Sequence, residues 1–278
     1  MRRDVLILAS ALACIAAPAL AGPVAPAASD WRAPDPDNVL VIDTSKGRVI
    51  VELVPEVAPG HVARLKELTR KGTYDGRTFF RVIDRFMAQT GDPQDTGAGG
   101  TDLPDLKAEF TFRRAADTAF TIAASPWGTE EGFVKSLPVV SQAMSWSDMT
   151  ADGKVAAWGS YCPGVVGMAR DDNPDSANSQ FFLMRQPYLS LDKRYTAFGR
   201  VISGLEAVRA IKTGEPAPAP QDRMDRVRVL ADIPVSERPT VRVIDPAGQW
   251  FKGEIARVRA DKGADFSLCD VNIPVEVK

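Results

Sequence analysis

The chain of 278 residues contains a single histidine, His61, and only three cysteines. Metal sites and Ser/His/Asp arrangements need such residues grouped together, and His61 has no histidine or cysteine near it in the sequence. We therefore expect no metal site, and we expect His61 to be a surface residue near the start of a helix. The formal net charge is only -2, which argues against the clustered basic excess of nucleic-acid-binding proteins.

Long hydrophobic runs are also missing, except at the N-terminus. Residues 1–21 combine the basic pair Arg2-Arg3, an apolar run over 5–17 and the small-residue sequence Ala19-Leu20-Ala21. The run is too short to span a bilayer as a helix, and the pattern is typical of a secretory signal peptide cleaved near Ala21. We therefore expect a periplasmic or secreted protein without stable membrane insertion.

The segment after the signal peptide has little periodicity. Residues 22–37 are rich in proline, alanine and aspartate, which predicts a linker. Signal cleavage would leave two cysteines, Cys162 and Cys269. In an exported protein such a pair can form a disulfide, but each can also be a small buried hydrophobic residue. The sequence leaves both alternatives open, because it does not show whether the two cysteines come within reach.

The most informative stretch runs from Thr78 to Asp92. Its aromatic and aliphatic residues favour a strand, and turn-forming residues bound it on both sides. Arg81 is the odd member, because arginine is always charged and fits poorly in a core unless its donors find partners. From residue types alone, the simplest interpretation places Arg81 at a strand edge, paired with Asp84 or Asp92.

This stretch resembles the first signature of the cyclophilin family of peptidyl-prolyl isomerases. The usual pattern is Phe-His-Arg-Val-Ile-x-x-Phe-Met-x-Gln-x-Gly-Asp, and here Phe80 replaces the histidine. The segments 167–183 and 191–201 resemble the second and third signatures, in the same order. The resemblance covers residues 38–234. It implies a mainly β fold, a closed antiparallel eight-stranded barrel capped by two helices.

Periodicity places several elements within this domain. We expect a hairpin of strands at 39–43 and 49–53, a helix over 57–72 and a second helix over 205–211. Residues 115–162 form an insertion, because the family normally crosses this gap with far fewer residues. Its tryptophans predict a packed excursion, and its position between two signatures predicts that it forms one rim of the binding groove.

Two further segments follow the second helix. Residues 215–220 alternate proline with other residues, which predicts an extended spacer. Residues 235–278 lie outside the resemblance and are expected to form a small C-terminal β extension. Within it, alternate residues from Cys269 to Val277 are apolar or cysteine, which predicts a half-buried strand at a sheet edge.

The implied chemistry needs no covalent bond to the enzyme and no cofactor. An Xaa-Pro bond prefers trans by only about 0.5–1 kcal/mol but rotates slowly, because rotation breaks amide resonance. A catalyst must hold the proline and favour the twisted amide over the planar one. The twisted imide nitrogen regains a lone pair, so a fixed guanidinium in a water-poor pocket can donate a hydrogen bond to it.

The resemblance assigns these roles to residues of this chain. Arg81 is the expected catalytic donor, and Gln89 and Gln180 are expected to orient it and to contact the substrate backbone. The other residues expected to bind substrate are Phe86, Met87, Ala169, Arg170, Phe182 and Leu191. Tyr195, which stands where many members carry histidine, joins this set. Ser190 stands where some members carry tryptophan, so the subsite preference should differ from theirs.

The leading hypothesis is an exported peptidyl-prolyl cis-trans isomerase, a monomer that binds proline-containing peptides and unfolded exported proteins. The alternative is a non-catalytic module of the cell envelope that binds proline-containing segments or acts as a chaperone. Arg81 together with Gln89 favours catalysis, because a pure binding module has less need of a charge at that position. A purely structural envelope protein is the least favoured hypothesis.

Overall fold

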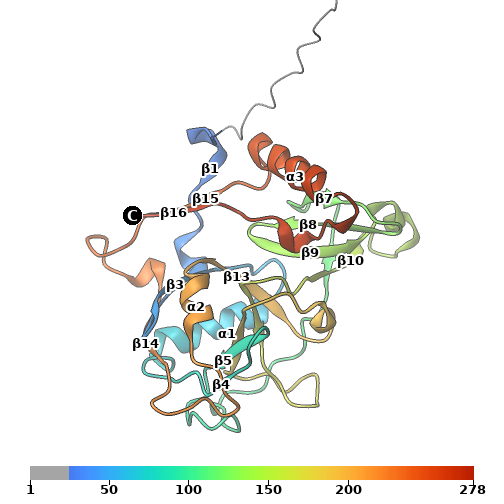
Figure 1. Ribbon diagram of the computed structural model, residues 1–278. Helices are drawn as coiled ribbons and strands as arrows, with labels where there is room; N and C mark the ends of the chain where they lie inside the picture. Colours follow the sequence, from blue (N-terminus) through green and yellow to red (C-terminus); the bar gives the residue numbers. More distant parts are fainter. Residues whose placement is uncertain (1–24) are drawn as a thin grey trace, which may run out of the picture.

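The computed structural model describes residues 25–278, so the expected signal peptide of residues 1–21 lies outside the described residues. A large curled sheet, in the lower half of Figure 1, joins eight antiparallel strands in the order β14-β2-β3-β13-β11-β12-β5-β4. These strands are β2 (Val39–Thr44), β3 (Gly47–Leu53), β4 (Arg81–Val82), β5 (Met87–Thr90), β11 (Val165–Met168), β12 (Phe181–Met184), β13 (Ala197–Ser203) and β14 (Met224–Val229). The expected mainly β class and the predicted first hairpin, β2-β3, are confirmed.

The sheet is open, and in this respect it differs from the expected closed barrel. β14 and β4 are its two edge strands and do not pair with each other. The edges approach at an isolated bridge between Thr78 and Arg223, just before each strand begins. β4 contains only two residues, so it offers too short a ladder for closure. The result is a strongly curled half-barrel.

The stretch 78–92 is a hairpin and not the single strand that its composition suggests. β4 and β5 pair antiparallel, with Arg81 opposite Gln89. Between them the chain reverses, and Arg85 adopts a φ of 55°. No glycine or proline marks this reversal, which is why turn chemistry did not reveal it. The hairpin places Arg81 and Gln89 on neighbouring strands.

Both predicted helices are confirmed. They are α1 (Pro59–Arg70) and α2 (Leu205–Ala210). Proline suits the first position of α1, because its missing N–H would have no partner there. Val62, Leu65 and Leu68 lie on one face of α1 and pack into the main core, which the sheet and α2 also line. The main core thus lies between the curled sheet and its two helices.

His61 is buried and not a surface residue. Its side chain is 1% exposed, and its Nδ1 lies 2.6 Å from Oε2 of Glu109. The same carboxylate accepts the backbone N–H groups of Gly60 and His61 in the first turn of α1. An anion at this position is favourable, because the first helical N–H groups lack partners within the helix.

The insertion folds into a sheet of its own, as a packed excursion. Its antiparallel strands pair in the order β6-β10-β9-β8-β7. They are β6 (Phe112–Arg114), β7 (Thr121–Ala124), β8 (Thr129–Val134), β9 (Leu137–Gln142) and β10 (Val155–Gly159). Trp158 is buried, whereas Trp127 and Trp146 are exposed, so only one of its tryptophans contributes to the packing.

The two ends of the described chain meet in a third sheet. β1 (Trp31–Arg32), β15 (Val241–Ile244) and β16 (Val275–Val277) pair in the order β1-β15-β16. The structure thus differs from the expected linker, because β1 is hydrogen-bonded into a sheet. It also corrects the expected tail strand: only residues 275–277 are extended in a sheet, and Cys269 lies in a 3₁₀ turn.

The C-terminal extension contains a helix that we did not expect, α3 (Gln249–Lys262). It lies beside β7 at the top of Figure 1. Phe251 of α3 contacts Phe133 of β8, with ring centroids 5.3 Å apart. Trp31, the insertion and the C-terminal extension share one apolar cluster around these rings. We call these three segments (25–38, 112–159 and 235–278) the accessory module.

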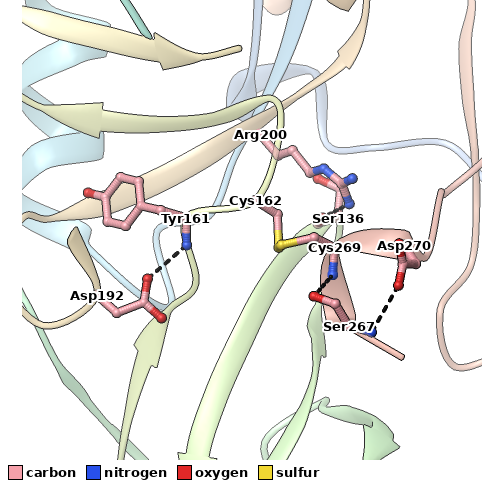
Figure 2. The surroundings of a disulfide bond; sticks show 8 residues. All are labelled: Ser136, Tyr161, Cys162, Asp192, Arg200, Ser267, Cys269 and Asp270. Atoms are coloured by element: carbon pink, nitrogen blue, oxygen red, sulfur yellow. Dashed lines mark hydrogen bonds between the residues drawn. A yellow bond between two sulfur atoms is a disulfide. The ribbon is translucent and has the colours of Figure 1, made fainter. Parts of the chain in front are cut away.

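A disulfide joins the accessory module to the main sheet (Figure 2). Cys162 follows β10 and precedes β11, and its sulfur is bonded to that of Cys269, with Cα atoms 5.0 Å apart. Short 3₁₀ helices complete the structure: Ala28–Asp30, Pro36–Asn38, Met144–Met149, Leu189–Leu191, Leu230–Asp232, Gly263–Asp265 and Leu268–Asp270. In the part of the chain from residue 25 onward, no helix has the length and apolar character needed to cross a membrane.

Candidate active site

One cleft of about 820 Å³ gathers the residues on which the sequence resemblance depends. All ten predicted site residues line it: Arg81, Phe86, Met87, Gln89, Ala169, Arg170, Gln180, Phe182, Leu191 and Tyr195. Its size is within the range of ligand-binding pockets, about 300–1,000 Å³. Sequence reasoning missed other lining residues: Phe80, the loop 95–99, residues 176, 178 and 179, Glu215, Pro216 and Gln221.

The apolar part of the cleft is built around the ring of Phe182 on β12. The ring centroids of Tyr161 and Tyr195 each lie 5.9 Å from it. Met87 and Leu191 belong to the same cluster. Phe181, the neighbouring residue, points to the other side of the sheet and packs against Tyr74 in the main core. Successive residues of a strand face opposite sides, so Phe182 alone of this pair faces the cleft.

The insertion lies behind this apolar pocket and does not form its rim. Leu137, Val139 and Ala157 of the insertion belong to the cluster that contains Phe182 and Met87. None of the described residues between 115 and 162 lines the cleft. The expectation of a groove rim was therefore wrong, because the insertion's sheet packs against the pocket from its buried side.

A chain of hydrogen bonds runs along the polar part of the cleft. Arg81 donates from a terminal nitrogen to Oε1 of Gln89, at 3.2 Å. The amide of Gln89 donates to Oε1 of Gln180, at 2.9 Å. The amide of Gln180 in turn donates to the carbonyl oxygens of Gly99, at 2.8 Å, and Gly97, at 3.2 Å. This chain connects the guanidinium to the backbone of the loop 95–99.

The partner of Arg81 at its other side is Glu215. Nε of Arg81 lies 2.6 Å from Oε1 of Glu215. Neither Asp84 nor Asp92, the partners considered from the sequence, pairs with Arg81 within the described part of the chain. The side chain of Arg81 is 42% exposed, so it faces the open cleft and is not enclosed in an internal ion pair.

Asp92 holds the loop 95–99 in place. Its buried carboxylate accepts the backbone N–H groups of Gln94, Thr96, Gly97 and Gly99. Burial raises the pKa of Asp92, but these four donors outweigh it and keep the pKa below its usual value. These hydrogen bonds fix the backbone of the loop, so its carbonyl oxygens are held in place as acceptors for Gln180.

Arg170 and Tyr195 also line the cleft and contact each other. The guanidinium of Arg170 lies over the ring of Tyr195, 4.5 Å from its centroid. Its Nε and one terminal nitrogen donate to the carbonyl oxygen of Arg194, at 3.2 and 3.0 Å. These contacts fix Arg170 as a wall of the cleft. Among residues 25–278 no group of three or more metal-ligating side chains is close enough to hold a metal ion.

Comparisons with known proteins show which family the chain resembles. A sequence model of the family described as cyclophilin type peptidyl-prolyl cis-trans isomerase/CLD matches residues 39–231. A probable peptidyl-prolyl cis-trans isomerase of Brucella suis is 37% identical over 196 residues, which cover 66% of this chain and 76% of that protein. Peptidyl-prolyl cis-trans isomerase-like 1 of Homo sapiens is 29% identical over 205 residues, which cover 73% of this chain and 94% of that protein.

A solved structure is similar over a larger part of the chain. The crystal structure of cyclophilin AquaCyp293 from Hirschia baltica superposes with a TM-score of 0.82 at 34% sequence identity. The match covers 89% of this chain and 93% of that chain, so it includes segments outside residues 39–231. On the family match, the relatives and the shared fold, the chain belongs to the cyclophilin family of peptidyl-prolyl cis-trans isomerases and is an enzyme.

Proposed function

We propose that this enzyme accelerates the rotation of Xaa-Pro bonds in exported proteins, with Arg81 as the donor that stabilises the twisted imide. The observation that carries the proposal is the position of the guanidinium. Arg81 lines the same cleft as Phe86, Met87, Phe182 and Leu191. These apolar side chains suit a pyrrolidine ring, and the guanidinium in the same cleft supplies a donor for the adjoining imide. A donor directed at the twisted state favours it over the planar state.

Some N–H groups of Arg81 remain for a substrate. A guanidinium carries five N–H groups. One of them donates to Glu215 and one to Gln89. Among the described residues no further acceptor is hydrogen-bonded to Arg81, which leaves three N–H groups for an imide nitrogen or a substrate carbonyl. Because Gln89 is itself held by Gln180, the donor is oriented before substrate binds, as electrostatic stabilisation requires.

The proposed site of action is the periplasm or the exterior of the cell. The pattern of residues 1–21 supports it, because a basic start, a short apolar run and small residues before Ala21 typify a secretory signal. Cell fractionation, with the N-terminus of the mature chain determined by mass spectrometry, tests this part. A chain that stays in the cytoplasm and retains residues 1–21 contradicts it.

The catalytic role is tested with a protease-coupled assay on Ala-Pro peptides. Arg81→Ala is expected to lower kcat/KM by roughly 10²–10³, the loss typical of removing one preorganised transition-state donor. Arg113→Ala is the matched control, because Arg113 is exposed to a similar extent and is paired with Asp152 in the insertion, away from the cleft. Unchanged turnover in Arg81→Ala would remove Arg81 from the mechanism. A wild-type protein that binds the peptide without turnover would favour the binding-module alternative.

A further inference from the structure

Glu215 lines the cleft and pairs with Arg81, although it lies outside the three sequence signatures. Its carboxylate oxygen Oε1 accepts a hydrogen bond from Nε of Arg81 at 2.6 Å. Both side chains are about half exposed, 42% for Arg81 and 50% for Glu215. Such an exposed pair would ordinarily be of little consequence, because long side chains in solvent adopt many conformations. In this pair, however, backbone hydrogen bonds hold the two segments that carry the side chains.

The segment that carries Glu215 is hydrogen-bonded to the strand that carries Arg81. The backbones of Val82 and Gly214 donate to each other, at 2.9 and 2.7 Å. The N–H of Ala217 donates to the carbonyl oxygen of Phe80 at 2.8 Å. The residues on either side of Arg81 are thus bonded to residues on either side of Glu215. This register fixes the two side chains opposite each other.

The far end of the segment is anchored as well. The carboxylate of Asp222 is buried and accepts from the backbone N–H of Lys212 at 2.9 Å and from Oγ of Ser45 at 3.0 Å. The carbonyl oxygen of Asp222 accepts from the N–H of Phe79 at 2.8 Å. Ala217, in the middle, is buried in the main core. The segment 212–222 is therefore a fixed edge of the cleft and not the extended spacer that its prolines suggest.

We propose that Glu215 is a positioning residue that orients the guanidinium of Arg81 for catalysis. The inference rests on the proposed role of Arg81. Glu215 holds Nε from one side and Gln89 holds a terminal nitrogen from the other. Two acceptors at different nitrogens define the plane of the guanidinium, and the remaining N–H groups keep a constant direction. A charge-assisted hydrogen bond is the stronger kind, so Glu215 is the firmer of the two supports.

The kinetic consequence follows from where Glu215 acts. It touches the donor and not the apolar pocket around Phe182, so its loss should leave peptide binding largely unchanged. Without Glu215 the guanidinium would sample other orientations, and fewer molecules would present a donor to the twisted imide. Misplacement of a catalytic group lowers kcat more than it changes KM. The exposed ion pair contributes little to stability, so the fold should persist.

Three variants test the proposal by steady-state kinetics on Ala-Pro peptides. Glu215→Ala is expected to lower kcat about ten-fold while KM changes less than about two-fold. Glu215→Gln keeps an oxygen acceptor of the same length and should restore most of the lost kcat. In an Arg81→Ala background, Glu215→Ala should have no further effect, because there is no guanidinium to orient. Asp225→Ala is the matched control, since Asp225 accepts from Nε of Arg223 at 2.7 Å on the surface, outside the cleft.

Other results would overturn the proposal. An unchanged kcat in Glu215→Ala would mean that Glu215 does not position Arg81. An increased kcat would mean that Glu215 holds Arg81 away from its catalytic orientation. An equal loss of kcat with and without Arg81 would show that Glu215 acts by another route. The failure of the proposed function would look different, because Arg81→Ala alone would then turn over like the wild type. Thermal unfolding of each variant verifies that the fold is intact.

Discussion

Glu52 on β3 carries a buried negative charge that links the accessory module to the main sheet. Its side chain is 2% exposed and accepts from two terminal nitrogens of Arg32, at 2.5 and 2.8 Å. It also accepts the backbone N–H of Ser136, between β8 and β9, at 3.2 Å. The N-terminal segment and the insertion therefore meet at a single buried carboxylate of the main sheet.

Replacing Arg32 by alanine would leave this carboxylate buried without its ionic partner. Breaking a buried ion pair in this way typically costs about 3–5 kcal/mol of unfolding free energy. We expect the lower end, about 3 kcal/mol, because Arg200 lies opposite Glu52 in the β13-β3 ladder and leaves a positive charge nearby. Glu52→Gln keeps an acceptor for Ser136 and should cost less, about 1–2 kcal/mol, since Arg32 is partly exposed and can be hydrated.

Urea unfolding followed by circular dichroism measures these differences for the two single variants and the double variant. Because the two residues are in direct contact, the double variant should lose clearly less than the sum of the single losses, by about 1–3 kcal/mol. Turnover of Ala-Pro peptides below the unfolding transition should stay unchanged, since neither residue lines the cleft. A loss below about 1 kcal/mol in Arg32→Ala, or strict additivity, would refute the reasoning.

Two further predictions concern stability. The disulfide between Cys162 and Cys269 closes a loop of 107 positions, so replacing both by serine should lower the unfolding free energy by about 2–5 kcal/mol. Urea unfolding measures this, and an unchanged midpoint would contradict it. Burial raises the pKa of Asp192 to about 6, so its carboxylate binds a proton more readily in the folded than in the unfolded protein. Proton binding by Asp192 therefore stabilises the folded protein at low pH, and this stabilisation is lost as the pH rises from about 4 to 6. Asn does not titrate in this range, so the wild type should gain stability relative to Asp192→Asn as the pH falls through this window, by up to about 3 kcal/mol. Thermal unfolding of both proteins at the two ends of the window measures this. A difference in stability that does not change with pH would contradict the prediction.

The parts of the fold that local sequence patterns predicted are those whose partners lie close in the chain. The β2-β3 hairpin has its turn at Ser45 and Lys46, directly before Gly47, and α1 carries its apolar residues at helical spacing. α3 has such a spacing too, at Phe251, Ile255 and Val258, but this stripe is short and was not recognised. The joint core of the accessory module depends on three segments far apart in sequence, and no local pattern shows that they meet.

The residues of the cleft were likewise predicted where a sequence pattern contains them, and missed where distant contacts place them. The family signatures contain all ten predicted lining residues, so the resemblance placed them together. Glu215 was missed because a charged residue in a proline-rich segment has no periodic signal, and its place depends on backbone bonds to Phe80 and Val82. His61 was misjudged for a similar reason, because its partner Glu109 lies 48 positions away and could not be recognised from either residue alone.

The two halves of the cleft are supported by different forces, and the insertion packs against one of them without lining the cleft. The apolar floor around Phe182 is continuous with the insertion's core, where Tyr161 stacks on that ring directly before Cys162. The polar edge is held by hydrogen bonds that two buried carboxylates accept: Asp92 from the backbone of the loop 95–99, and Asp222 from the segment that carries Glu215. Packing contacts depend on shape and hydrogen bonds on direction. The floor can therefore hold a proline ring by shape, while the edge holds Arg81 in one direction.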